Sequence, residues 1–257
     1  MPPQFPQNRF LIHFFAFVSD WKLELNPVSG FLSFLRNLLF GSPLNQEHLL
    51  RNNGAAILGH LLSEVKPSLL DVNVLMVAQL LLEMARDAGN PALLRALHQH
   101  VLFNFNIWSC GPFHIRIGHI QYISSVIKED RKAFRKRYGV QFLLDAIRTH
   151  HSAPGDLVGA DDGRALRLAM LRLIRYYISK EVNIKEVTAI IGFLTSVKEE
   201  ILVLEVLEMV ILHLEGQCKD QLFLLLFEPH AADLLYCLLL DRRFSMDLKQ
   251  KVLKVSC

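Results

Sequence analysis

The sequence predicts an all-α protein, and three observations support this prediction. Apolar residues recur every three or four positions along most of the chain, which is the pattern of one buried helix face. No segment shows a sustained polar–apolar alternation, so no strand is predicted. The breaks between periodic segments are short and hold proline or glycine, as in Gly89-Asn90-Pro91, where Asn90 is expected to cap a helix that begins at the proline. One periodic segment illustrates the spacing: Leu70, Val74, Val77, Leu81 and Met84.

The composition indicates helices that are buried on more than one side. Hydrophobic residues make up 51% of the 257 residues and charged residues 21%, which excludes a disordered chain. A mean hydropathy of +0.26 raises the question of a membrane span. The run from Phe10 to Val18 is too short, however, and the run from Ile201 to Leu214 is interrupted by Glu205 and Glu208, so neither provides the roughly 20 apolar residues that a span requires.

The cysteines and the N-terminus favour a cytoplasmic protein. Arg9 precedes an apolar run, but no small-residue cleavage site follows it, so a secretory signal is not expected. The four cysteines contain no C-x-x-C pair, which argues against a disulfide framework or a zinc site. The formal net charge of +3 is mild, so any basic binding site must be local. The cysteines are Cys110, Cys218, Cys237 and Cys257.

A weak internal repeat predicts how the helices are organised. Three segments align so that Gly54, Gly139 and Ala231 share one position, at separations of 85 and 92 residues. Two units of about 40–47 residues fit each interval, which is the armadillo/HEAT period. We therefore expect an armadillo/HEAT-like helical repeat, an α-solenoid, in which the glycine opens a helix. An irregular helical bundle without a period is the alternative. The aligned segments are residues 51–62, 136–147 and 228–239.

The repeat pattern suggests a division of the chain. Residues 1–50 are expected to form N-terminal helices of uncertain packing, and residues 51–257 the armadillo-like repeats, with a flexible loop at residues 151–163. The chain opens into a structured-looking segment and stops within a helical pattern, so the solenoid is expected to be truncated at its ends. Truncation would expose apolar faces that neighbouring repeats normally cover, which predicts aggregation or dependence on a partner.

Residues 102–152 resemble a known family. The segment contains Asn104-Phe105, Ile107-Trp108-Ser109, a run from Arg116 to Tyr122 and a second run from Tyr138 to Asp145. It is similar to the helical region of the neurobeachin group of BEACH-domain proteins, and closest to the neurobeachin-like branch. The motif residues that we expect to be structural are Trp108, Arg116, Gly118, His119, Gln121, Tyr122, Tyr138 and Gly139.

The resemblance implies a scaffold. In this family an armadillo-like helical stretch lies upstream of PH-like, BEACH and WD40 modules and is implicated in vesicle trafficking and secretory granule biogenesis. None of these modules is recognisable in the 257 residues, so the chain reads as a fragment or short isoform. The resemblance implies a cytoplasmic protein, peripheral to endomembranes, whose partners are other proteins.

Five cations are the candidate contact residues. Their spacing of i, i+3, i+4, i+7 and i+8 would put them on one face of a single helix. Such a face could meet an acidic partner, or an anionic membrane at about 1 kcal/mol per residue, which makes a peripheral membrane module the alternative function. A solvated face eased by Glu129 and Asp130 is the simpler interpretation, and nucleic acid is disfavoured because no recognition module accompanies the cations. The five are Lys128, Arg131, Lys132, Arg135 and Lys136.

The remaining constellations predict no catalysis. Trp108 and its neighbouring phenylalanines could anchor a peptide, but core packing is favoured. Arg116 and His119 lie one turn apart, and the sequence offers them no nucleophile or carboxylate partner. No nucleotide-binding, zinc-protease or hydrolase motif is present. We therefore expect a non-enzymatic protein without a cofactor or a metal.

Overall fold

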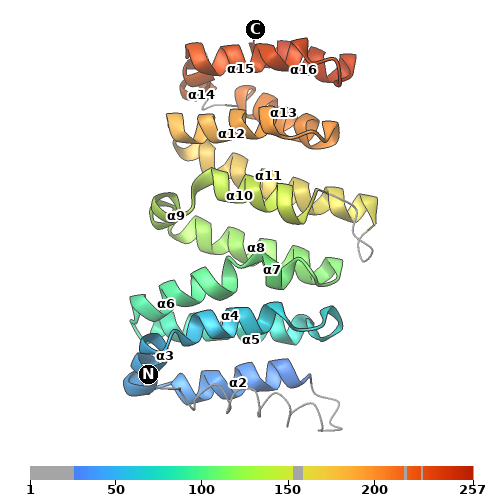
Figure 1. Ribbon diagram of the computed structural model, residues 1–257. Helices are drawn as coiled ribbons and strands as arrows, with labels where there is room; N and C mark the ends of the chain where they lie inside the picture. Colours follow the sequence, from blue (N-terminus) through green and yellow to red (C-terminus); the bar gives the residue numbers. More distant parts are fainter. Residues whose placement is uncertain (1–25, 153–158, 217–218, 227, 257) are drawn as a thin grey trace, which may run out of the picture. The chain divides into compact units, whose positions relative to one another are not determined.

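The computed structural model describes residues 26–152, 159–216, 219–226 and 228–256, and these residues form helices and no strand (Figure 1). The all-α prediction is therefore confirmed. The chain divides into two compact units, residues 1–115 and 116–257, and each is described by itself. In the described part, no single helix has the length and apolarity to cross a membrane; only the bent pair Asp220–Leu226 and Ala231–Leu240, which meet at 77°, has them jointly.

The first unit is built from short helices joined by capped turns. Its α2 packs against α5, and α4 packs against α6, η2 and α7. Asn90 begins α6 as predicted, because its Oδ1 accepts a hydrogen bond from Leu93 N at 3.0 Å and Pro91 follows at the first helical position. The elements are α2 (Pro27–Leu39), α3 (Pro43–Arg51), α4 (Gly54–Ser63), η1 (Pro67–Leu69), α5 (Val72–Asp87), α6 (Pro91–Leu97), the π-helical η2 (His98–Leu102) and α7 (Phe105–Trp108).

The core of the first unit is the apolar stripe that the sequence predicts. All five apolar positions from Leu70 to Met84 are buried. Trp108 is also buried, and its indole Nε1 donates a hydrogen bond to Val101 O at 2.9 Å. Gly59 allows α4 and η2 to approach closely, since a Cβ at this position would lie 2.1 Å from His100 O.

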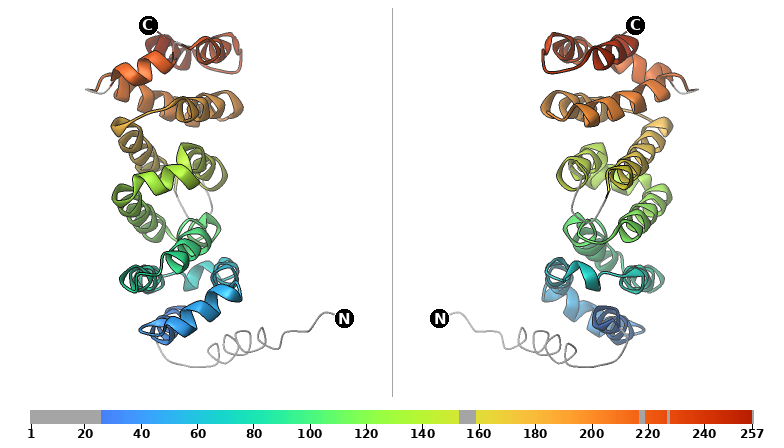
Figure 2. Two further views of the ribbon diagram at one scale, coloured as in Figure 1. Left: turned by 90° about the vertical axis from the view of Figure 1, so that its left-hand side faces the viewer. Right: turned by 90° about the vertical axis from the view of Figure 1, so that its right-hand side faces the viewer.

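The second unit consists of helical pairs in two layers. One layer runs α10, α12, α15 and the other runs α11, α13, α16, and each helix packs on the next in its layer (Figures 1 and 2). The elements are α8 (Phe113–Glu129, whose first residues belong to the first unit), α9 (Arg131–Arg137), α10 (Gly139–His150), α11 (Ala160–Lys180), α12 (Ile184–Ser196), α13 (Glu200–Leu214), α14 (Lys219–Leu226), α15 (Pro229–Leu240) and α16 (Met246–Ser256).

The helix starts in the second unit reproduce the expected period. The helices α10, α12 and α15 begin at residues 139, 184 and 229, which are 45 residues apart, within the armadillo/HEAT range. Gly54 and Gly139 open α4 and α10 as predicted, and Gly139 has a φ of +71°. The third segment differs, because α15 begins at Pro229, two residues before Ala231. Proline fixes its own φ and so starts the helix without the glycine.

The predicted loop at residues 151–163 is shorter than expected. Residues 153–158 lie outside the described residues, and Ala160 already begins α11. Asp161 and Asp162 stand in the first turn of that helix, where carboxylates favour the positive helix end. Of the predicted N-terminal helices, residues 1–25 lie outside the described residues, and the domain division at residue 50 stays a prediction.

Candidate interaction surface

The five predicted cations do not share one helix. The helix α8 ends at Glu129, and Asp130 adopts φ −134° and ψ 70° before α9 begins at Arg131. The Asp130 carboxylate accepts a hydrogen bond from Ala133 N at 3.0 Å and so caps α9. The prediction of a continuous one-sided stripe is therefore wrong. The physical reason is that an aspartate carboxylate can accept a hydrogen bond from a free backbone N–H. An aspartate can therefore start a new helix as readily as it can lie inside one.

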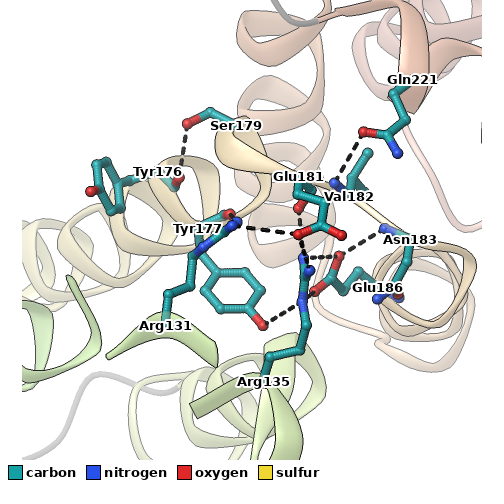
Figure 3. Close-up of polar contacts among 10 residues, drawn as sticks. All are labelled: Arg131, Arg135, Tyr176, Tyr177, Ser179, Glu181, Val182, Asn183, Glu186 and Gln221. Atoms are coloured by element: carbon teal, nitrogen blue, oxygen red, sulfur yellow. Dashed lines mark hydrogen bonds and ion pairs between the residues drawn. The ribbon is translucent and has the colours of Figure 1, made fainter. Parts of the chain in front are cut away.

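Arg135 points inward, into a polar cluster between α9, α11 and α12 (Figure 3). Its Nε and Nη2 donate to the two carboxylate oxygens of Glu186 at 2.9 and 3.1 Å, and its Nε also donates to Tyr177 Oη at 3.1 Å. Its Nη2 donates to Glu181 O at 2.7 Å. Burial alone would lower the pKa of the guanidinium, but the Tyr177 hydrogen bond and the Glu186 charge raise it above the ordinary value. Arg135 is therefore a permanent cation that holds three helices together.

Glu186 joins this cluster to the start of α12. Its carboxylate accepts a hydrogen bond from Asn183 N at 2.9 Å, while Asn183 Oδ1 accepts one from Glu186 N at 3.1 Å. This is a capping box, in which two free donors at a helix start are satisfied reciprocally. Only 5% of the Glu186 side chain is exposed. One carboxylate thus caps α12 and neutralises Arg135.

Two adjacent tyrosines on α11 each receive two cations. The guanidinium carbons of Arg131 and Arg135 lie 5.9 and 5.4 Å from the Tyr177 ring centroid. The ammonium groups of Lys128 and Lys180 lie 5.1 and 5.6 Å from the Tyr176 ring centroid. Arg131 also donates a hydrogen bond to Tyr177 O at 3.2 Å. Cation–π attraction therefore anchors the end of α8 and the start of α9 to the end of α11.

Of the predicted cations, Lys132 and Lys136 remain in solvent. Both are exposed and four residues apart on α9, and neither has an ion-pair partner in the described part of the chain. Lys128 is exposed as well, above Tyr176. Arg131 and Arg135 have only about a fifth of their side chains exposed, at 21% and 22%. The contact role of the five cations stays a prediction, and the geometry gives it most simply to the three lysines.

A second cationic surface, on α11, was not predicted. Arg164 and Arg172 are exposed and Arg175 is half-exposed, and none of the three has a hydrogen-bond or ion-pair partner among the described side chains. At about 100° per residue these side chains fall within an arc of about 80° on one side of the helix. The sequence signal was present as the spacing i, i+8, i+11, but Arg167 lies within this run and is buried.

Arg167 forms a buried ion pair that the sequence analysis missed. Its Nε and Nη2 donate to the two carboxylate oxygens of Glu205 on α13 at 2.7 and 2.9 Å, and its Nη1 donates to His151 O at 3.2 Å. The exposed fractions of the two charged side chains are 9% and 6%. The pair has a structural role, since it ties α11 to α13 and to the end of α10.

The family-motif residues range from buried to exposed, and their structural role stays a prediction. His119 is buried with 1% of its surface exposed, while Arg116 and Tyr122 are half-buried and Gln121 is exposed. Tyr138 stacks on the buried Phe134 with ring centroids 5.5 Å apart. Gly118 lies half-buried on α8, and Gly139 takes the left-handed conformation that opens α10.

The end of α10 holds a histidine that is buried and neutral. Burial, reinforced by the charges of His150, Arg116, His119 and Arg167, lowers the pKa of His151 to about 3. The pKa of His150 is also lowered, first by burial and then by Arg116. Within the described residues no three or more histidine, cysteine or acidic side chains cluster as metal ligands. The buried, neutral state of His151 therefore links the stability of the fold to pH.

Comparison with known proteins identifies the family. Residues 19–246 match the family model described as the Neurobeachin/BDCP, DUF4704 alpha solenoid region. A BEACH domain-containing protein of Dictyostelium discoideum, lvsD, is 27% identical over 138 residues, which cover 47% of this chain and 5% of that protein. The chain thus spans a small part of the length of this relative. No solved structure matches the chain significantly.

The chain is an α-solenoid segment. It belongs to the neurobeachin/BDCP family, as its alpha solenoid region, and the family resemblance read from residues 102–152 is confirmed.

Proposed function

We propose that this segment is a non-catalytic scaffold that holds other proteins on the outer faces of its helices. The observation that supports the proposal is the separation of charges in the second unit. Arg135 and Arg167 are neutralised inside the fold by Glu186 and Glu205. Lys132 and Lys136 of α9, and Arg164 and Arg172 of α11, are exposed to solvent instead. Stacked helical repeats bury their own apolar faces and leave long outer surfaces for docking.

The cellular setting of this scaffold is vesicle trafficking, including secretory granule biogenesis, at the cytoplasmic side of endomembranes. The support is the family resemblance, together with the relative's description as a BEACH domain-containing protein. In this proposal the segment supplies a binding surface, and the trafficking activity belongs to the longer protein.

Retention of specific partners tests the scaffold role. The immobilised chain is exposed to cytosol and to a vesicle extract, and bound proteins are quantified with and without an excess of free chain. We expect a defined set of proteins whose retention is saturable and is competed by the free chain. If nothing retained is competed, the scaffold proposal fails. Unchanged retention by the double variant Lys132→Glu/Lys136→Glu would remove these two lysines from the contact surface.

A peripheral membrane module is the second candidate, and the exposed pair Lys132 and Lys136 favours it. Both lysines could approach an anionic bilayer, where each contributes about 1 kcal/mol near the surface. Flotation with vesicles of phosphatidylcholine, with and without phosphatidylserine, tests this function. Binding that requires phosphatidylserine, weakens with salt and is lost in Lys132→Glu/Lys136→Glu supports it. Binding that is independent of anionic lipid would eliminate it.

A further inference from the structure

The outer side of α11 carries a row of cations that form no ion pair with the side chains that the structure describes. We define this cationic ridge as Arg164, Arg172 and Arg175, continued at the end of the helix by Lys180 and Lys128, whose ammonium groups both lie near the Tyr176 ring. Arg164 and Arg175 are eleven residues apart, which is about 16 Å along a helix. The ridge therefore runs along the axis of α11 for a few helical turns.

The arginines of α11 differ in their ion pairing: the buried one is paired inside the fold, and the exposed ones are not paired with any described side chain. On the buried side Arg167 has a bidentate partner at 2.7 and 2.9 Å. On the outer side the only acids of the same helix are Asp161 and Asp162 in its first turn, and neither forms an ion pair with Arg164 in the described structure. At the other end Glu181 is already engaged by Arg131 and Arg135. Within α11 and its C-terminal cap, acids therefore stand only at the two ends of the row of arginines.

The chemistry of the ridge favours carboxylates on a protein over a lipid surface. Three of its cations are arginines, whose planar guanidinium groups bind carboxylates in a bidentate manner. Adsorption of a helix onto a bilayer uses exposed apolar side chains that insert beside the cations. The large hydrophobic side chains that are exposed in the described structure include none between residues 116 and 183. Leu168 and Tyr176 of α11 are half-buried, so they are not free to insert into a bilayer. Their exposed parts can contact apolar side chains of a protein partner.

We infer that the cationic ridge of α11 is the docking site for an acidic protein segment, one that presents glutamate or aspartate side chains along a single helix face. This inference rests on the proposed scaffold function and names the chemistry of a partner. The occupant lies along α11 so that successive carboxylates meet Arg164, Arg172 and Arg175. Its apolar side chains pack on Leu168 and Tyr176.

Binding of a synthetic acidic peptide to the full chain tests the inference. The probe is a fluorescent helical peptide of about 18 residues, which is about 27 Å long and so extends past the three arginines at both ends, with glutamates every three or four positions. A peptide with glutamine in place of glutamate is its control. We expect the acidic peptide alone to bind, with affinity that falls several-fold between about 0.05 and 0.3 M salt.

Charge reversal locates the site. The variant Arg172→Glu/Arg175→Glu should weaken peptide binding at least about tenfold, because attraction becomes repulsion. The matched control Lys185→Glu/Lys198→Glu, at two exposed lysines outside the ridge, changes the net charge equally and should bind as the original chain does. If the reversed variant does not melt cooperatively by circular dichroism, Arg172→Gln/Arg175→Gln replaces it, with an expected loss of several-fold.

The remaining outcomes overturn the inference in distinguishable ways. Equal loss in both charge-reversed variants would show a nonspecific effect of net charge. Flotation with phosphatidylserine vesicles that depends on Arg172 and Arg175, without peptide binding, would assign the ridge to a membrane. The peptide could bind equally well to the original chain and to the variant Arg172→Glu/Arg175→Glu. If the chain still retains competed partners from cytosol, this result would refute the docking site on the ridge but not the scaffold proposal. If the original chain retains no protein from cytosol that free chain can compete away, the scaffold proposal itself fails.

Discussion

At the scale of single residues, the second unit depends on a few buried charged or polar groups. Arg167 and Glu205 meet in a bidentate ion pair, and the Arg167 guanidinium also donates to the carbonyl oxygen of His151. Removing two charges from water is costly, so such a pair favours one arrangement of the helices more than it adds stability. Burial, reinforced by nearby positive groups, lowers the pKa of His151 and keeps its ring neutral.

Breaking the buried pair should be far more damaging than removing it. We expect Glu205→Ala to lower the free energy of unfolding by about 3–5 kcal/mol, because Arg167 stays buried without its partner. The double variant Arg167→Met/Glu205→Leu should recover most of this loss. As a control, Arg148→Ala at the exposed pair with Asp145 should cost less than about 1 kcal/mol. Denaturant unfolding measures all three, and a mild Glu205→Ala would contradict the prediction.

Acid should destabilise the fold through His151. Its pKa is about 3 in the folded chain and 6.5 in its ordinary state, so the unfolded chain binds the proton first as the pH falls. The contribution of the neutral His151 ring to the free energy of unfolding is complete above pH 6.5 and is lost progressively toward pH 3. At pH 5 the loss is about 2 kcal/mol. Unfolding measured between pH 7 and 5 should show this slope in the original chain and in His114→Gln, whose ring is exposed, but a weaker slope in His151→Leu.

At the scale of the helix, short elements form because neighbouring elements complete them. The helix α9 has only seven residues, which is too short to be stable alone in water. Asp130 caps its start, Phe134 packs into an aromatic cluster with Tyr138 and Tyr177, and Arg135 reaches Glu186. The helix is therefore a product of its contacts with α11 and α12.

The capping box of α12 gives a graded test of this coupling. Asn183→Ala should cost about 1 kcal/mol of unfolding free energy, the usual value for a lost helix cap. Glu186→Ala should cost about 1 kcal/mol more, since Arg135 also loses a partner of its charge-assisted hydrogen bonds. A double-mutant cycle with Arg135→Ala should show coupling between the two charged residues. Additive effects of Arg135→Ala and Glu186→Ala would contradict the proposed connection between α9 and α12.

At the scale of the whole molecule, each unit leaves large apolar side chains in solvent. In the first unit Phe40 and Leu44 are 65% and 63% exposed, and in the second unit Leu224, Leu240 and Met246 are 69%, 80% and 70% exposed. Burial of large exposed apolar side chains favours association between proteins. These side chains do not belong to the cationic ridge.

The purified chain should therefore self-associate. Sedimentation velocity should show an average mass that rises with concentration. Leu224→Glu/Leu240→Glu should reduce this rise, because charges oppose burial of the apolar surface. Ile201→Glu, which changes one of the exposed apolar side chains of α13, should leave the association unchanged. A monomer at all concentrations would contradict the prediction and would also remove the expectation of aggregation.

Local patterns in the sequence determined the helical class, the apolar faces, the repeat length and the family. Periodicity, caps and motif residues act over a few neighbouring positions, so Asn90 and the stripe from Leu70 to Met84 could be assigned without coordinates. The tertiary structure decided which charges are neutralised. Arg135 and Arg167 look like Lys132 and Arg172 in the sequence, and only the approach of Glu186 and Glu205 from helices about 40 to 50 residues away distinguishes them. The energy of a charge depends on burial and on a partner within a few ångströms, and neither is a local property of the chain.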